Sequence, residues 1–301
     1  MADTSRREFL RSSAAAAAVI RGSSFLAQQT LFANSAKSPA IEKGLVYSML
    51  PETFSHRDRC KLARDVGFDV VQVPTTSDER TAEEIKAAAD KAGIRIDSVM
   101  NVDHWDYPLS SSDPGVVEKS LSGMRTSMRN AKLWNSDVVL LVPAVVNAQT
   151  SYRDAWTRSQ RHIRKLIPLA SELKVVIGIE EVWNKFLLSP LEMQRYIAEF
   201  DSPWIQAWFD TGNVLLYGYP QDWIRTLAKS IVKLHIKDFK REKDEYQWVN
   251  LGDGDTDWPE VRKALAEINY AGSAIVELEG GDEAYLRDVN RRLDELLLGN
   301  P

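Results

Sequence analysis

The chain has 301 residues, of which 44% are hydrophobic and 27% are charged, and its formal net charge at pH 7 is −5. This balance is typical of a globular protein with a sizeable core, so disordered and fibrous classes are excluded. A net negative charge gives no general attraction to nucleic acid, and we expect no nucleic-acid partner. Cys60 is the only cysteine, which excludes an intrachain disulfide.

The first 36 residues are interpreted as a twin-arginine signal peptide. Arg6 and Arg7 precede an alanine-rich apolar stretch at 14–20, and small residues follow at 33–36. Export requires charged, apolar and cleavable regions in this order, so we expect the twin-arginine export machinery as a partner and a periplasmic or secreted location. The alternative is a terminal tail that holds two arginines by chance. No run reaches the ~20 apolar residues of a spanning helix, so we expect no stable membrane anchor.

Residues 37–301 alternate between two kinds of segment and are predicted to form one domain. Short apolar runs rich in β-branched residues indicate strands, and amphipathic stretches such as 81–92, 116–133, 155–173 and 259–268 indicate helices. The expected strands are 44–50, 68–74, 94–101, 136–143, 174–181, 205–212, 231–238 and 273–280. This order predicts a (β/α)8 TIM barrel, an α/β fold with parallel strands. The alternative, a doubly wound open sheet, would be expected to carry a glycine-rich dinucleotide fingerprint, and the sequence has none.

Several of the predicted helices begin with residues that cap a helix. Asp113, Ser189 and Asp257 each offer a side-chain oxygen just before a proline-containing first turn. Ser189 and Asp257 are also followed three residues later by glutamate, which is the capping-box spacing. The helix assignments therefore rest on end signals as well as on periodicity.

The fifth to eighth strands of the predicted barrel end in polar residues. One residue from each gives Glu180, Asp210, His235 and Glu277. Side chains at the C-terminal ends of barrel strands point into a common mouth, so we expect these four to meet. Three ionised carboxylates would repel each other there unless a divalent cation neutralised them. Each residue alone is more often a loop cap or a surface charge, but four on consecutive strands indicate a site suited to Mn²⁺, Mg²⁺ or Co²⁺.

Motifs in the second half of the chain carry a family resemblance. They are residues 178–190, 209–213 (Phe-Asp-Thr-Gly-Asn), 234–239 (Leu-His-Ile-Lys-Asp-Phe) and 270–272 (Tyr-Ala-Gly), the last preceding Glu277. With these motifs the chain resembles the xylose isomerase-like sugar phosphate isomerase and epimerase family, in particular its pentulose- and hexulose-phosphate 3-epimerase branch. The likeness extends over most of the predicted domain, and these motifs are its most specific part.

The resemblance implies a sugar isomerase or epimerase that depends on a divalent metal. It places the ligand roles on Glu180, Asp210, His235 and Glu277, with Mn²⁺ as the preferred ion and Mg²⁺, Co²⁺ or Zn²⁺ as alternatives. Glu180 and Glu277 are also implied as catalytic residues. One carboxylate would remove a proton next to the carbonyl of a ketose, and the other would return a proton to the enediolate. The neighbouring Glu181 is expected to point away from the barrel axis.

Four further residues are candidates for binding the substrate. His104 follows the third strand and Trp183 follows the fifth, where each would contact or stack on a sugar ring. Arg241 follows the seventh strand, where the resemblance implies a substrate-contacting arginine. Asn213 stands where many relatives carry histidine, and Gln72 stands near the end of the second strand where an acidic residue is common. Either departure would change which sugar is accepted.

Two other functions remain open from the sequence, namely a metal-dependent hydrolase or lyase on the same barrel and a non-catalytic sugar-binding protein. A multi-zinc hydrolase would need more histidines than the four in the chain. Sugar phosphates are cytoplasmic, and no glycine-rich phosphate cradle follows the eighth strand. An exported protein is therefore expected to act on an unphosphorylated ketose, keto-sugar or keto-glycoside. The sequence leaves open which sugar this is and whether the chain forms a homo-oligomer.

Overall fold

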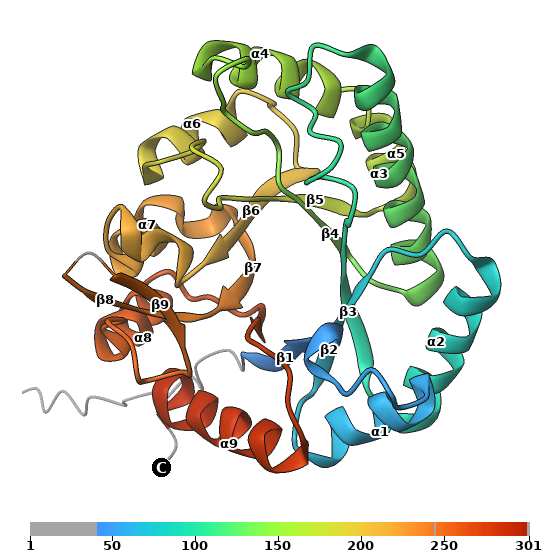
Figure 1. Cartoon of the computed structure of the whole chain (residues 1–301), viewed down its shortest axis with the longest axis vertical. Coiled ribbons are helices and arrows are strands. Elements are labelled where there is room, and N and C mark those ends of the chain that lie inside the picture. The colour runs from blue at the N-terminus through green and yellow to red at the C-terminus, as the bar shows by residue number, and fades with distance from the viewer. Residues whose placement is uncertain (1–40, 244, 300–301) are drawn as a thin grey trace, which may run out of the picture. The chain divides into compact units, whose positions relative to one another are not determined.

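A computed structural model describes residues 41–243 and 245–299, and it confirms the predicted barrel. Eight parallel strands close into a ring in the order β1-β10-β7-β6-β5-β4-β3-β2 (Figure 1). Helices surround this ring, so that each strand has the barrel interior on one side and a helical layer on the other. The predicted export signal at 1–36 lies outside the described residues.

The elements of the fold alternate along the chain as expected for a (β/α)8 barrel. The barrel strands are β1 (Glu42–Val46), β2 (Val70–Pro74), β3 (Arg95–Met100), β4 (Val138–Leu141), β5 (Val176–Glu180), β6 (Ile205–Asp210), β7 (Ile231–Ile236) and β10 (Ser273–Val276). The α-helices are α1 (His56–Asp65), α2 (Glu79–Ala92), α3 (Pro114–Trp134), α4 (Tyr152–Ile163), α5 (Ile167–Leu173), α6 (Pro190–Ala198), α7 (Pro220–Leu227), α8 (Trp258–Glu267) and α9 (Glu283–Leu293). Short helical turns are η1 (Tyr47–Met49), η2 (Asn213–Leu216), η3 (Ala228–Ser230) and η4 (Asp294–Leu298).

The strands are apolar at successive positions because both of their faces are covered. Every residue of β4 and of β10 is buried. A strand covered on both faces cannot alternate between apolar and polar residues without burying unpaired polar groups. This explains why the strands appear in the sequence as short continuous apolar runs.

The predicted helix caps are confirmed. The side-chain oxygens of Asp113, Ser189 and Asp257 accept hydrogen bonds from backbone N–H groups in the first turns of α3, α6 and α8. These bonds satisfy donors that have no partner within the helix. No helix in the described part of the chain has the length and apolar character needed to cross a membrane.

Three details differ from the sequence prediction. The first strand ends at Val46, because residues 47–49 turn into η1. The single helix predicted over 155–173 is two helices, and Pro168, which lacks the N–H of a helix interior, lies in the first turn of α5. An antiparallel hairpin of β8 (Asp238–Glu242) and β9 (Glu245–Val249), which was not predicted, follows β7 outside the barrel.

A network of buried charges lies inside the barrel, toward the N-terminal ends of the strands. Asp97 of β3 is fully buried and accepts hydrogen bonds from Lys233 of β7 (2.8 Å), Arg95 (2.8 Å) and Ser273 of β10 (2.6 Å). Lys233 Nζ also lies 3.1 Å from Asp137 Oδ1. Burial raises the pKa of Asp97, but Lys233, Ser273 and Arg95 outweigh that influence and hold the pKa below its ordinary value. The network therefore ties together three strands of the barrel.

Candidate metal centre and active site

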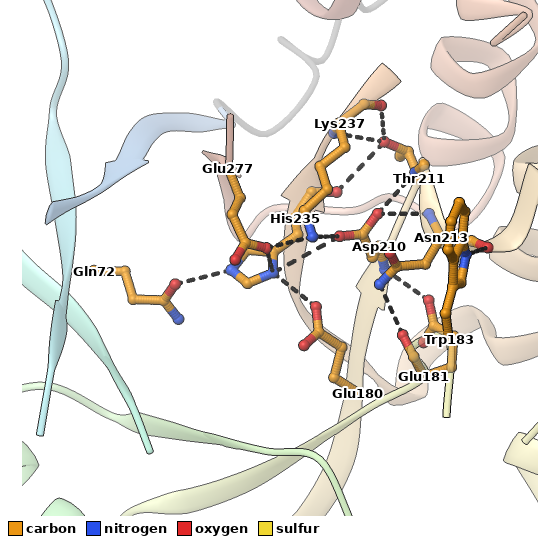
Figure 2. Close-up of polar contacts among 11 residues, drawn as sticks. Gln72, Glu180, Glu181, Trp183, Asp210, Thr211, Asn213, His235, Lys237 and Glu277 are labelled. Atoms are coloured by element: carbon orange, nitrogen blue, oxygen red, sulfur yellow. Dashed lines mark hydrogen bonds and ion pairs between the residues drawn. The ribbon is translucent and has the colours of Figure 1, made fainter. Parts of the chain in front are cut away.

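Four side chains meet at the C-terminal ends of neighbouring strands (Figure 2). Glu180 is the last residue of β5, Asp210 is the last residue of β6, His235 lies near the end of β7, and Glu277 follows β10. Their nearest ligand atoms all lie within 4.8 Å of one another. The structure therefore brings together the four residues that the sequence selected, from positions almost 100 residues apart in the chain.

His235 lies at the centre of this cluster. Its Nδ1 atom is 2.7 Å from Glu180 Oε1, 3.0 Å from Glu277 Oε2 and 3.9 Å from Asp210 Oδ2. On the other side of the ring, Nε2 is 2.8 Å from Gln72 Oε1. An amide oxygen only accepts, so Nε2 carries the proton that it donates to Gln72. This bond fixes the ring with Nδ1 facing the three carboxylates.

Lys237 is part of the same cluster, and the sequence analysis missed it. Its Nζ atom lies 2.6 Å from Glu277 Oε2 and 3.1 Å from Asp210 Oδ2. Side chains two residues apart on a strand point to the same side, so the position of Lys237 relative to His235 was a usable signal. Lys237 and His235 together place two basic groups among three carboxylates.

The two candidate catalytic carboxylates have opposite electrostatic surroundings. Burial is the largest influence on Glu180 and raises its pKa above the ordinary value. Burial also raises the pKa of Glu277, but His235 and Lys237 outweigh it and hold the pKa of Glu277 well below the ordinary value. Burial lowers the pKa of His235, whereas Glu277 and Glu180 raise it to about 10. The two glutamates therefore differ in proton affinity although they contact the same imidazole.

A second layer of contacts holds Asp210 in place. Its Oδ1 atom accepts hydrogen bonds from the backbone N–H groups of Gly212 (2.7 Å) and Asn213 (2.9 Å). Glu181 Oε1 accepts from the backbone N–H of Asp210 (2.9 Å), and the side-chain amide of Asn213 donates to the Glu181 carbonyl (2.9 Å). Glu181 is thus buried behind Asp210 and outside the four-residue cluster.

The donor set fits a divalent ion. Asp210 Oδ2 pairs with Lys237 but accepts no well-directed hydrogen bond, so a buried carboxylate oxygen retains capacity to bind a cation. Three carboxylates and one imidazole are ligands suited to Mn²⁺, Mg²⁺ or Co²⁺, and Zn²⁺ also accepts them. An ion at this site would be held by Glu180, Asp210, His235 and Glu277.

Three of the predicted substrate-binding residues, His104, Trp183 and Asn213, lie in segments that follow the C-terminal ends of barrel strands. His104 is buried after β3, and burial lowers its pKa to about 4 although Glu277 opposes this effect. Trp183 follows β5, is 39% exposed, and donates from Nε1 to the carbonyl of Asn213 (2.9 Å). The side-chain amide of Asn213 donates a hydrogen bond to the backbone carbonyl of Glu181, so Asn213 has a structural role. The substrate contacts of all three remain predictions.

Arg241 lies apart from the cluster in β8 of the hairpin. Its guanidinium carbon lies 5.5 Å from the centre of the Tyr246 ring, and its backbone N–H donates to Asp255. The structure does not bring Arg241 to the four-residue cluster, and its predicted contact with substrate remains untested.

The family model described as a xylose isomerase-like TIM barrel matches residues 60–296. The chain therefore belongs to the xylose isomerase-like TIM barrel family. It is 25% identical over 256 residues to the L-ribulose-5-phosphate 3-epimerase of Shigella boydii serotype 18, and the match covers 80% of this chain and 88% of that protein.

Solved structures of other sugar epimerases share the fold. A D-psicose 3-epimerase, solved in the presence of D-fructose, matches with a TM-score of 0.71 at 18% identity and covers 86% of this chain and 100% of that one. The 3-keto-D-glucoside 4-epimerase of E. coli matches with a TM-score of 0.72 at 16% identity, covering 84% of this chain and 99% of that one. At such identities the likeness shows the fold, and the site has to be argued from its own residues.

Proposed function

We propose that this protein is a divalent-metal-dependent epimerase or isomerase of a ketose or keto-sugar. The observation that carries the proposal is the meeting of Glu180, Asp210, His235 and Glu277 within 4.8 Å at the barrel mouth. The L-ribulose-5-phosphate 3-epimerase relative and the epimerases that share the fold support the same class of reaction.

Glu180 and Glu277 are the proposed acid–base pair. Both carboxylates contact Nδ1 of His235, so both line the part of the mouth where the substrate would bind. One of them removes the proton from a carbon beside the ketose carbonyl. The other carboxylate returns a proton to the enediolate from the opposite face, which inverts that carbon. Return of the proton to the neighbouring carbon would instead interconvert a ketose and an aldose. A divalent ion would supply polarisation of the substrate oxygens.

Lys237 and Gln72 support this chemistry without exchanging protons with the substrate. Lys237 pairs with Glu277 and Asp210, so it orients both carboxylates. Gln72 fixes the orientation of His235 through Nε2. Positioning of this kind is needed because acid–base catalysis depends on the carboxylate lying within hydrogen-bond reach of the moving proton.

We infer that the substrate is unphosphorylated and that the protein is exported. The loop after β10, where barrels often bind phosphate, presents the carboxylates of Glu279 and Asp282 rather than a basic group. Arg6 and Arg7 in the proposed twin-arginine signal at 1–36 support export to the periplasm or out of the cell. Sugars found there are mainly unphosphorylated. Replacing both arginines with lysine should keep the protein, with its signal uncleaved, in the cytoplasm, and unchanged export would contradict this inference.

The proposed function is tested by removing and restoring the metal. The protein should lose ketose epimerisation after treatment with a chelator and regain it with Mn²⁺, and elemental analysis should find about one ion per chain. Unphosphorylated ketoses and their aldose isomers would be screened by chromatography. Activity that persists fully without metal would contradict the proposal, as would metal binding with no isomerisation of any sugar tested.

A further inference from the structure

The exposed aromatic side chains of the described residues gather at one end of the barrel. Each of the seven lies in a segment that follows the C-terminal end of a barrel strand, and none lies on the opposite end. They are Phe54, Trp105, Trp183, Tyr217, Tyr219, Tyr246 and Trp248. Exposed aromatic groups concentrated beside a candidate active site are typical of a binding surface. We call these seven residues the aromatic rim, and the β8–β9 hairpin contributes Tyr246 and Trp248 to it.

A cavity of about 790 Å³ opens between β9 and the segment that follows β10. Its wall includes Lys237 and Glu277, so the cavity begins at the four-residue cluster and extends outward from it. Tyr246, Trp248, Glu279 and Tyr285 are among its other lining residues. Pockets of this size hold ligands that are considerably larger than one monosaccharide. The reacting sugar at the cluster would therefore leave part of the cavity for a second group.

Packing holds the aromatic wall of this cavity in place. The ring of Trp248 stacks on Trp183 with centroids 4.9 Å apart, and Phe239 contacts both of these rings from behind. Trp248 also lies against Gly212, where an added Cβ would come within 2.9 Å of the ring. Trp248 nevertheless remains 43% exposed and Tyr246 remains 48% exposed. These contacts fix the position of Trp248 in the wall of the cavity.

We propose that this cavity is a second subsite, which binds a glycosyl ring joined to the reacting sugar. The apolar C–H face of a pyranose packs well against an aromatic ring, and Glu279 and Gln247, which also line the cavity, offer polar groups for its hydroxyl groups. The substrate class is then a keto-disaccharide rather than a free ketose. This inference rests on the proposed function of the neighbouring cluster.

The test compares keto-disaccharides with a free ketose on the full, Mn²⁺-loaded protein. Lactulose, maltulose and isomaltulose each join a hexosyl ring to fructose, so D-fructose is the matched monosaccharide. We expect kcat/KM for at least one of the three to exceed that for D-fructose by about tenfold, and Trp248→Ala to remove most of that ratio. Tyr219→Ala is the control, because Tyr219 belongs to the same rim but does not line the cavity, and it should leave the ratio unchanged.

Binding measured by calorimetry provides a second readout that does not depend on turnover. A keto-disaccharide should bind about tenfold more tightly than D-fructose to the wild type, and this difference should shrink in Trp248→Ala. If D-fructose is epimerised but no disaccharide is preferred in turnover or binding, the subsite is wrong and the proposed function stands. If no sugar is turned over but the Trp248-dependent preference in binding is present, the subsite stands and the proposed function fails. Equal binding of all sugars overturns the subsite.

Discussion

The two ends of the barrel both contain buried charges, but the pairing of those charges differs. Toward the N-terminal ends of the strands, Asp97 receives hydrogen bonds from three donors and Lys233 is paired. At the mouth, the three carboxylates of Glu180, Asp210 and Glu277 share two basic groups, which are His235 and Lys237. Buried carboxylates that outnumber their basic partners repel one another unless a cation lies between them, so this end of the barrel is suited to binding a cation.

Basic residues that follow one another along one stretch of chain have different roles at the two ends of the barrel. Lys233 and His235 lie at alternate positions of β7 and Lys237 directly follows the strand in the same alternation, so the three side chains point to the same side. Lys233 belongs to the network of buried charges around Asp97, and His235 and Lys237 belong to the cluster at the mouth. Changes at the two ends should therefore separate stability from catalysis.

The largest effect is expected on catalysis from the glutamates at the mouth. Glu180→Gln and Glu277→Gln should each reduce kcat by roughly 10² to 10⁴ because the variant loses a group that can accept a proton. Glutamine keeps one oxygen that can bind a cation, so metal content should fall only in part. Steady-state kinetics and elemental analysis measure the two effects. Near-normal turnover with metal bound would exclude the two-glutamate mechanism.

The next largest effect is expected on stability from the opposite end of the barrel. Asp97→Asn leaves Lys233 without its main buried partner, and the free energy of unfolding should fall by about 3–5 kcal/mol. The matched control is Asp137→Asn, because Asp137 also pairs with Lys233 but is 66% exposed, and it should cost no more than about 1 kcal/mol. Denaturant titration measures both. Equal losses in the two variants would contradict the role given to Asp97.

A smaller effect is expected from the residue that orients His235. Gln72→Leu removes the acceptor of the Nε2 proton while roughly keeping the volume of the side chain. Removing such a partner typically costs 10- to 100-fold in metal affinity, and we expect a loss in about that range. Competition with a chelator measures the affinity. Unchanged affinity would mean that the imidazole is oriented by its neighbours without Gln72.

The smallest effect is the pH dependence that Asp97 gives to stability. Its pKa is lower in the folded protein than in the unfolded chain, so the ionised carboxylate stabilises the fold above the unfolded pKa of about 4. This contribution should be lost progressively as the pH falls through the folded value. The stability difference between wild type and Asp97→Asn should therefore be largest near neutral pH and narrow in acid. A constant difference from pH 7 to pH 3 would contradict this.

Much of the fold was predictable because its local signals agree with one another. Short apolar strands alternate with capped helices, and both patterns indicate the same barrel. The four-residue cluster was also accessible, because Glu180, Asp210, His235 and Glu277 stand at or near the ends of those strands. Glu181 shows the limit of this reasoning, since alternation excluded it from the cluster but gave no sign that it supports the backbone of Asp210.

The remaining features depend on contacts between distant elements. Gln72 on β2 and His235 on β7 are not on neighbouring strands, so no local pattern indicates their hydrogen bond. The β8–β9 hairpin was missed because its strands are short, polar and outside the barrel, and its alternating Tyr246 and Trp248 were the one available signal. The position of Arg241 depends on that hairpin and was therefore not predictable.

Exchange of substrate protons with solvent deuterium tests the pairing of Glu180 and Glu277 most directly. The Mn²⁺-loaded Glu180→Gln and Glu277→Gln variants would be incubated in D₂O with a ketose substrate, and separately with its epimer. If the two carboxylates serve opposite faces, one variant should incorporate deuterium into the ketose without forming the epimer, and the other should do so only when started from the epimer. Loss of exchange from both sugars in both variants, or normal epimerisation by either, would contradict the proposed acid–base pair.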